Sequence, residues 1–282
     1  MRIIPSVDIR FVDSGDYRIA THILENPGGE GDLVLLHGAG VASEPTWYPM
    51  LPAFRSYRRV ICPDLHGMGR SHALDFEERP ITASAVASDV YGLLKEFAVT
   101  RCQMVGYSFG GLISLMVNAL NPGVISDLVL LEPALLERAS LKALRELRSR
   151  YAIAASLLLT EGDPIVGVKQ FLDLISPNRS THHCIESVTV QRLASRPRGL
   201  AYALMAVNQA AQQIDRIGLI DQAPRTLSLV GSKSVDDAHA FHQILAASKD
   251  IWFYRSVSGV DHAMPYQKPG VCAQFICEHF GR

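Results

Sequence analysis

The sequence predicts an α/β fold built on a mostly parallel sheet that is flanked by helices. Short apolar segments of strand length recur along the chain, and helical segments separate the later ones. This alternation is typical of parallel sheets, because a helix returns the chain to the start of the next strand. The strand-like segments lie near residues 19–23, 33–36, 59–62, 102–106, 127–132, 226–230 and 251–257.

One long stretch interrupts the alternation. Between residues 133 and 217 the strand signals stop and helical periodicity takes their place. The helices of this stretch are expected at residues 141–155, 164–175, 181–194 and 197–214. We therefore expect a core made of residues 1–132 and 218–282, with a helical insertion at 133–217. A helical lid over the strand ends would form most of an apolar substrate pocket.

The composition is that of an ordinary globular protein. The 282 residues are 48% hydrophobic and 20% charged, which is enough apolar material for a large core. A net charge of −1 supplies no electrostatic attraction for nucleic acid. No apolar run approaches the roughly 18 residues of a membrane-spanning helix, so no membrane insertion is expected. Five cysteines without an N-terminal signal segment predict free thiols and a cytoplasmic location. The oligomeric state does not follow from the composition.

The most informative motif follows the apolar run at 102–106. Residues 106 to 111 read Gly-Tyr-Ser-Phe-Gly-Gly, which is the G-x-S-x-G pattern of a sharp strand-to-helix turn. Such a turn is strained and brings strand and helix too close for a Cβ, hence the glycines on both sides of the serine. Ser108 is therefore the candidate nucleophile.

A serine hydroxyl is a weak nucleophile and needs a base. In the chain order that accompanies this turn, the acid and then the histidine follow the serine. His262 lies in the loop after the last expected strand, directly before a C-terminal helical segment. This position predicts that His262 is the general base.

An oxyanion site is expected beside the serine. The buried run at 33–36 leads into His37-Gly38-Ala39-Gly40, where small residues leave the backbone amides accessible to a substrate oxygen. The predicted pair of donors is the amide of Ala39 and that of Phe109, directly after Ser108. His37 precedes the serine in the chain, so we expect it to hold the glycine loop rather than to act as the base.

These segments together resemble those of the α/β-hydrolases, and in particular the capped, lipase- and esterase-like serine hydrolases. The resemblance runs from about residue 20 to the end of the chain and rests on residues 37–40, 64–71, 106–111 and 261–262. It implies a mostly parallel α/β-hydrolase sheet with a helical cap inserted after the strand that this family numbers as its sixth, here 127–132. It also implies that the loop from Asp64 to Ser71 is structural, with Asp64 and Arg70 holding loops together.

The resemblance leaves the acid of the triad open. Most of the family carries an aspartate three residues after the glycine at the end of the seventh strand, but Ser234 occupies that position here. Glu132, at the end of the sixth strand, is one candidate, because some relatives place the acid there. Asp236 is the alternative, although the sequence from Ser234 to Asp237 is also a capping pattern that opens a helix.

Candidates for substrate binding come from two regions. Gly38 belongs to the expected oxyanion loop, and Trp47 follows it, where the indole either covers the pocket mouth or packs beneath it. In the insertion, apolar side chains such as Phe171-Leu172, Leu204 and Met205 either line the pocket or pack the cap onto the core.

The predicted activity is that of a serine hydrolase that cleaves a carboxylic ester or lactone of a small to medium apolar substrate through an acyl-enzyme. A carbon–carbon bond hydrolase or a hydroxynitrile lyase would use the same Ser108 and His262. The alternative to an enzyme is a small-molecule receptor that has this fold and little turnover. A serine at position 108, rather than an aspartate, argues against haloalkane dehalogenase and epoxide hydrolase chemistry. No cofactor or metal is expected, because the sequence holds neither a phosphate-binding glycine loop nor a metal-ligand set.

Overall fold

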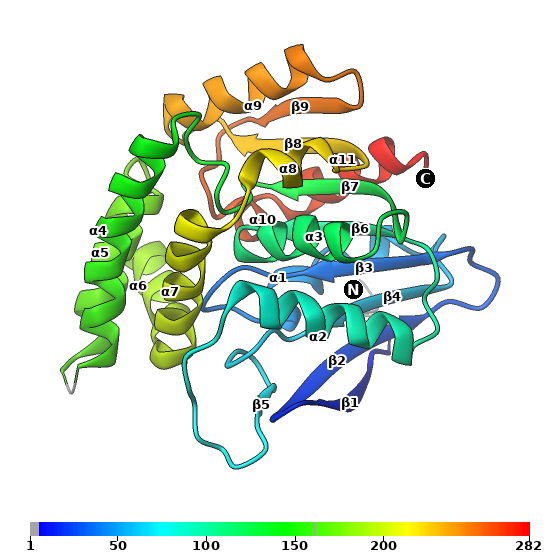
Figure 1. Cartoon of the computed structure of the whole chain (residues 1–282), viewed down its shortest axis with the longest axis horizontal. Coiled ribbons are helices and arrows are strands. Elements are labelled where there is room, and N and C mark those ends of the chain that lie inside the picture. The colour runs from blue at the N-terminus through cyan, green and yellow to red at the C-terminus, as the bar shows by residue number, and fades with distance from the viewer. Residues whose placement is uncertain (1–5, 161) are drawn as a thin grey trace.

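The computed structural model describes residues 6–160 and 162–282, and a twisted sheet runs through its centre (Figure 1). The strands are β1 (Asp8–Ser14), β2 (Tyr17–Glu25), β3 (Asp32–Leu36), β4 (Arg59–Pro63), β5 (His72–Ala73), β6 (Cys102–Tyr107), β7 (Ile125–Leu131), β8 (Arg225–Gly231) and β9 (Trp252–Val257). Their order across the sheet is β1-β2-β4-β3-β6-β7-β8-β9, with β5 paired to β2. The pairs from β4 to β9 are parallel, whereas β2 runs antiparallel to β1, β4 and β5.

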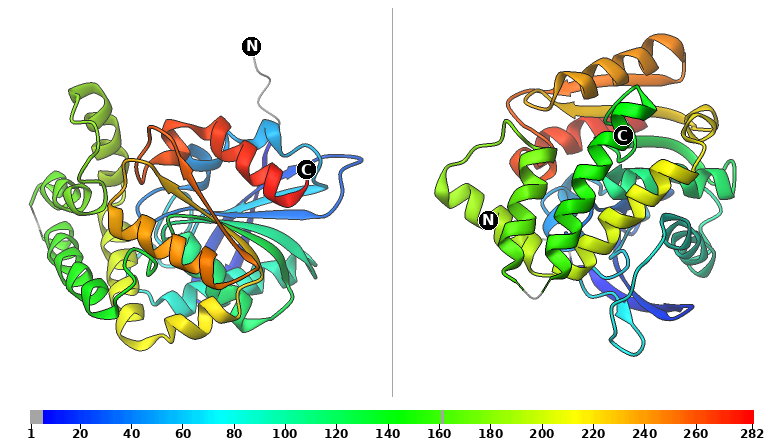
Figure 2. Two further views of the ribbon diagram at one scale, coloured as in Figure 1. Left: turned by 90° about the horizontal axis from the view of Figure 1, so that it is seen from above. Right: turned by 60° about the vertical axis from the view of Figure 1, so that its left-hand side comes forward.

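Helices flank both faces of the sheet. The helical elements of the described chain are α1 (Ser43–Trp47), the 3₁₀ turn η1 (Leu51–Ala53), α2 (Ala83–Glu96), α3 (Phe109–Leu120), α4 (Leu141–Leu159), α5 (Pro164–Ile175), α6 (His183–Ala194), α7 (Pro197–Gln213), α8 (Arg216–Asp221), α9 (Asp236–Ser248), α10 (Met264–Gln267) and α11 (Pro269–Phe280). Figure 2, left, shows α11 in red and α8 in yellow on opposite sides of the sheet. The predicted fold class, a mostly parallel sheet flanked by helices, is confirmed.

Alternation along the central strands divides the core into two layers. In β3, Leu33 and Leu35 pack with α1, η1 and α11, whereas Val34 and Leu36 pack with α2 and α3. All four side chains are essentially inaccessible to solvent. A strand buried on both faces reads as a continuous apolar run, which explains why 33–36 was recognisable from the sequence.

The parallel register brings the carboxyl ends of the central strands to one edge. Leu36 pairs with Gly106, Tyr107 with Leu131, and Leu131 with Leu229. The residues that follow β3, β6 and β7 therefore emerge side by side. In open α/β sheets this edge is where ligands bind.

Helices α4 to α7 occupy the stretch between β7 and β8, and Figure 1 shows them gathered at one end of the sheet. α4 packs against α5 and α7, and α5 packs against α6. Local signals start several of them: the side chain of Ser140 caps α4, and that of Asp163 caps α5 with Pro164 in its first turn. The expected boundary at 217 falls inside α8, which packs on α3. The division into core and insertion stays a prediction.

Two strands were not expected from the sequence. In β1 the side chains are exposed or half-buried, and β5 is only two residues long, so neither carries an apolar run.

The four described cysteines are unpaired thiols. No helix in the part of the chain that the structure describes is both long and apolar enough to cross a membrane.

Candidate active site

Ser108 lies at the turn between β6 and α3. Its backbone dihedrals are φ 52° and ψ −114°, a conformation that an L-residue adopts only under constraint. The Ser108 amide donates to the carbonyl of Leu131 (3.0 Å), which ties the turn to the end of β7. Ser108 is half-buried, whereas Tyr107 and Phe109 on either side are buried. The turn thus presents a hydroxyl at the edge of the sheet.

The neighbouring glycines explain why the turn can form. A Cβ at Gly106 would lie 2.5 Å from the hydroxyl of Ser114, and one at Gly110 would lie 2.3 Å from the carbonyl oxygen of Leu36. Both distances are shorter than real Cβ contacts, and at Gly110 the obstacle is backbone. The motif is therefore imposed by the close approach of strand and helix.

Glu132 and His262 meet at the same edge. Glu132 directly follows β7, and its Oε2 lies 2.8 Å from Nδ1 of His262. Its Oε1 accepts from the amide of Gly231 (2.8 Å) and from the hydroxyl of Ser234 (2.5 Å). Glu132 has φ 40°, a second strained backbone position beside Ser108. Both side chains of the pair are almost fully buried.

The carboxyl of Glu132 is held in its ionised form. Burial by itself raises its pKa, but the hydrogen bond and charge of His262 and the donors at Ser234 and Gly231 outweigh burial, so the pKa lies below its ordinary value. An ionised carboxylate accepts the Nδ1 proton of His262 and leaves Nε2 of the ring free to accept another proton.

The alternative acid lies elsewhere. Asp236 is exposed at the first position of α9. The expected capping pattern is wrong in one respect: α9 begins after Val235, with no side-chain cap, and the hydroxyl of Ser234 is directed to Glu132 instead. Glu132, which follows β7, thus accepts hydrogen bonds from two donors at and just after the end of β8, the amide of Gly231 and the hydroxyl of Ser234.

The loop after β3 lies against the serine. A Cβ at Gly38 would lie 3.2 Å from that of Ser108. The backbone amides of Ala39 and Phe109 donate to no acceptor among the described residues. Nδ1 of His37 lies 2.8 Å from the carbonyl of Gly38, and its Nε2 accepts from the amide of Leu65 (2.9 Å). Burial lowers the pKa of His37, and with both ring nitrogens bonded to backbone, it holds the loop.

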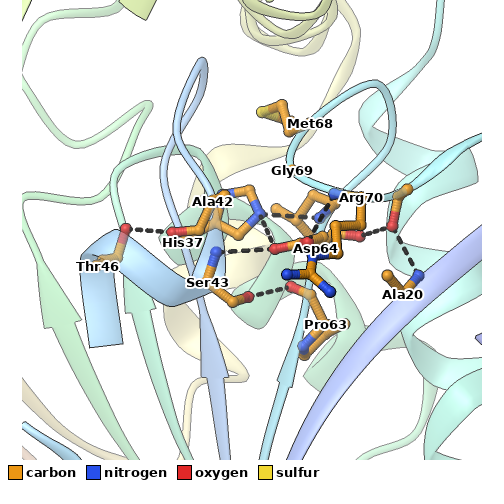
Figure 3. A network of polar contacts seen from close by, with 12 residues as sticks. Ala20, His37, Ala42, Ser43, Thr46, Pro63, Asp64, Met68, Gly69 and Arg70 are labelled. Carbon is orange, nitrogen blue, oxygen red and sulfur yellow. Dashed lines mark hydrogen bonds and ion pairs between the residues drawn. The ribbon is translucent and has the colours of Figure 1, made fainter. Parts of the chain in front are cut away.

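The buried carboxylate of Asp64 joins this loop to the next one, as Figure 3 shows. Its two oxygens accept from the amides of Ser43 and Arg70, each at 2.8 Å, and His22 Nε2 lies 3.1 Å away. Burial opposes ionisation of Asp64, but the hydrogen bonds from His22 and from the amide of Arg70 contribute to an overall lowering of its pKa. The network fits the structural role that the resemblance implied for this loop.

A cavity of about 540 Å³ opens between the strand ends and helices α5 and α6. Both Ser108 and His262 lie on its wall, together with Gly38 and Ala39. The other residues on the wall are Val41, Tyr107, Phe171, Leu172, Ile175, Ser176, Val188, Thr189, Arg192, Leu193, Ala263, Tyr266 and Gln267. A cavity of this size is typical of small-molecule sites.

The predicted substrate-binding residues divide into two groups. Gly38, Phe171 and Leu172 lie on the cavity wall. Trp47, by contrast, is fully buried in the core, because α1 turns the indole beneath the loop.

The prediction that Leu204 and Met205 of α7 bind the substrate is not supported either. Leu204 is buried in the core cluster, and Met205 is 41% exposed on the outer side of the helix. Neither lines the cavity, because α7 packs against α4 while α5 and α6 form the wall.

Sequence reasoning missed Arg192 and the aromatic residues Tyr107 and Tyr266, which lie on the cavity wall. Their proximity in sequence to Ser108 and His262 was the available signal for the two tyrosines; Arg192 has no comparable marker. Among the side chains that the structure describes, no group of three or more His, Cys, Asp or Glu residues could hold a metal ion.

The chain is similar to known proteins both in sequence and in fold. The chain is 31% identical over 113 residues to the 2-hydroxy-6-oxo-2,4-heptadienoate hydrolase of Pseudomonas putida, a match that covers 38% of this chain and 39% of that protein. The chain thus aligns with about two fifths of the length of this curated relative.

Two solved structures resemble the whole fold. A hydrolase from Pseudomonas aeruginosa superposes with a TM-score of 0.78 at 18% identity, covering 98% of this chain and 99% of that one. The enol-lactonase from Burkholderia xenovorans superposes with a TM-score of 0.73 at 17% identity, covering 97% and 100% of the two chains. At these identities the likeness concerns the fold. Residues 33–275 match the family model described as "Alpha/beta hydrolase family", and the chain belongs to that family.

Proposed function

We propose that this protein is a serine hydrolase that cleaves a carboxylic ester or lactone of a small to medium apolar substrate through an acyl-enzyme. The observation that carries the proposal is that a serine on a strained turn and a histidine paired with a buried carboxylate border the same cavity. A nucleophile, a base and a group that orients the base are the minimum set for acyl transfer.

In this mechanism each residue has one role. Nε2 of His262 removes the proton from Ser108, whose oxygen attacks the substrate carbonyl. The amides of Ala39 and Phe109, which have no acceptor among the described residues, bind the oxyanion. His262 then protonates the leaving alcohol and activates the water that releases the acid.

Glu132 is proposed as the acid of the triad. It contacts His262 directly, and its lowered pKa keeps it ionised to stabilise the imidazolium that forms during attack. Ser234, which stands where most of the family carries the aspartate, donates to Glu132 and holds it in place. Asp236 is left as a first-turn residue of α9, where a negative charge is favourable for the helix.

Helices α4 to α7 are proposed to act as a cap that sets substrate preference. Phe171 and Leu172 of α5 and Leu193 of α6 place apolar side chains on the cavity wall, opposite the strand ends. Burial of an acyl chain against them would contribute roughly 0.8 kcal/mol per methylene.

A carbon–carbon bond hydrolase is the second candidate. It is favoured by the similarity to a hydrolase whose name gives its substrate as an oxo-dienoate, a ketone rather than an ester. The same serine, histidine and carboxylate would serve either reaction, since both begin at a carbonyl carbon.

Labelling and product analysis test the proposal. A fluorophosphonate probe should label the wild type and not Ser108→Ala, and this variant should lose about 10⁴-fold or more in kcat. Ser176→Ala is the matched control, because Ser176 is another serine on the cavity wall and should leave labelling intact. Panels of esters, lactones and diketones then separate the two activities. Labelling that persists in Ser108→Ala would contradict the mechanism, and turnover of diketones alone would favour the second candidate.

A further inference from the structure

The cavity beside Ser108 holds one feature that an apolar substrate does not need. Among the described residues on its wall, Arg192 is the only one with a permanent charge. Most of its neighbours there are apolar or aromatic, including Val188 and Leu193 of the same helix, α6.

Arg192 is held in place by an aromatic ring. Its guanidinium carbon lies 4.3 Å from the ring centre of Tyr266, and the Tyr266 hydroxyl is hydrogen-bonded to Thr46 (2.7 Å). A guanidinium carries its N–H donors in its own plane, so a ring that covers its face leaves these donors available. The contact therefore orients the arginine but provides no acceptor for its N–H donors.

Other arginines in the structure show how unusual this is. The remaining described arginines that are at least half-buried each donate to a carboxylate or to backbone carbonyls. The pairs are Arg59–Asp32, Arg79–Asp75, Arg138–Asp237, Arg148–Glu137, Arg179–Asp173 and Arg196–Glu78, and Arg216 donates to the carbonyls of residues 135, 138 and 139. Arg192 has neither kind of partner among the described residues.

The contrast with Arg196 is the sharpest. Both arginines lie on the wall of a second cavity of about 290 Å³ that adjoins Gly40 and Met68, but only Arg192 also borders the cavity of Ser108. Arg196 is engaged by Glu78 and by the carbonyl of Gly69 (3.0 Å). A partly desolvated cation without an anion is unfavourable, and an anion that docked beside it would relieve this cost.

We propose that Arg192 binds a carboxylate of the substrate, so that the preferred substrates are esters or lactones with a second, ionised carboxyl group, such as monoesters of dicarboxylic acids. The inference rests on the proposed function, because it assigns a substrate class to the same cavity. A carboxylate matches the planar fork of a guanidinium and forms two parallel hydrogen bonds with it. The apolar wall then holds the chain between that carboxylate and the scissile carbonyl.

Two substrates that differ only in charge test this. The p-nitrophenyl monoester of adipic acid carries a free carboxylate, and its methyl ester has the same chain without the charge. Wild-type kcat/KM should be about 10- to 100-fold higher for the anionic substrate, the range expected for a charge-assisted hydrogen-bonded pair. Arg192→Gln should abolish this preference, because kcat/KM should fall by about 10- to 100-fold for the anionic ester and by much less for the methyl ester. Arg192→Lys should retain part of the preference, because it keeps the charge but not the fork.

Arg198→Gln is the matched control. Arg198 is exposed near the start of α7 and lies on neither cavity, so this variant removes the same charge without touching the site. It should keep the wild-type preference for the anionic ester. Equal loss of preference in both variants would mean that the arginines act by long-range attraction, and the proposal would be wrong.

The remaining outcomes separate the inference from the proposed function. If the wild type hydrolyses both esters equally well, or if Arg192→Gln lowers both equally, Arg192 has a structural role and the inference fails while the hydrolase mechanism stands. If neither ester is turned over and Ser108 is not labelled, the proposed function itself fails.

Discussion

Replacing Glu132 with glutamine tests the proposed triad most directly. The carboxylate uses both oxygens: Oε1 accepts from the amide of Gly231 and the hydroxyl of Ser234, and Oε2 contacts Nδ1 of His262. In Glu132→Gln the amide oxygen is expected to keep the Oε1 position, because two donors face it. The amide NH₂ then faces Nδ1 of His262.

The consequence for the imidazole follows from hydrogen-bond chemistry. An N–H that faces Nδ1 requires Nδ1 to be an acceptor, so the proton of the neutral ring moves to Nε2. With Nε2 protonated, His262 cannot accept the proton of Ser108. The same tautomeric error in another serine triad costs about 10⁴-fold in kcat. At about 1.4 kcal/mol per factor of ten, this is roughly 5 kcal/mol of transition-state stabilisation.

The assay combines kcat for a chromogenic ester with thermal unfolding followed by circular dichroism. We expect Glu132→Gln to lose about 10⁴-fold in kcat while it keeps the fold, since the amide of Gly231 and the hydroxyl of Ser234 retain an acceptor. Asp236→Asn is the control: Asp236 is exposed in the first turn of α9, so only a small stability change of about 0.3–1 kcal/mol is expected. The reasoning is refuted if Glu132→Gln stays within about tenfold of wild-type kcat, or if Asp236→Asn suffers the large loss.

Three further predictions concern stability and the cavity. The folded-state pKa of Glu132 lies below its ordinary value of 4.5, so its ionised form stabilises the fold above pH 4.5, and this contribution is lost as the pH falls from 4.5 through the lower folded-state pKa. In urea unfolding, the free energy of unfolding should therefore fall less steeply with decreasing pH in Glu132→Gln than in the wild type. An unchanged pH dependence would contradict this. Gly110→Ala should lower the free energy of unfolding by about 1–3 kcal/mol, since its Cβ would meet a backbone carbonyl at 2.3 Å. The control is Gly92→Ala in helix α2, where the added Cβ would meet no atom within 4 Å apart from its chain neighbours and the adjacent helix backbone, and it should raise the free energy of unfolding by up to about 1 kcal/mol. Equal effects of the two substitutions would contradict the close approach of strand and helix at Gly110. Leu172→Trp should shorten the longest acyl chain that is hydrolysed, because Leu172 lies on the cavity wall, while Met205→Trp on the outer side of α7 should leave the chain-length profile unchanged.

Which carboxylate lies beside His262 is a matter of tertiary structure. Glu132 and Asp236 both follow strands that end at the same edge, so the sequence left both open. The choice depends on the backbone conformation after β7, where φ of 40° at Glu132 accompanies a side chain directed to the histidine. It also depends on β8, whose end supplies Ser234 as a donor. No local pattern encodes that contact, which spans 102 residues.

The cavity wall was equally hidden from the sequence. Apolar residues on an amphipathic helix can face a pocket or a neighbouring helix, and their identity is the same in either case. Leu204 packs into the core and Leu172 lines the cavity only because α7 contacts α4 whereas α5 and α6 lie over the strand ends. The lack of a partner for Arg192 likewise emerges only when every nearby element is placed.

The sequence by itself determined the features whose physical cause is local. Buried strands such as β3 read as apolar runs, helices between them imply a parallel sheet, and the glycines around Ser108 reflect steric limits within a few residues. Tertiary structure alone decided the rest: which face of each cap helix meets the cavity, which carboxylate meets His262, and which cation is left unpaired. These depend on register and packing between segments far apart in the chain, and the free energies involved arise only when the fold brings them together.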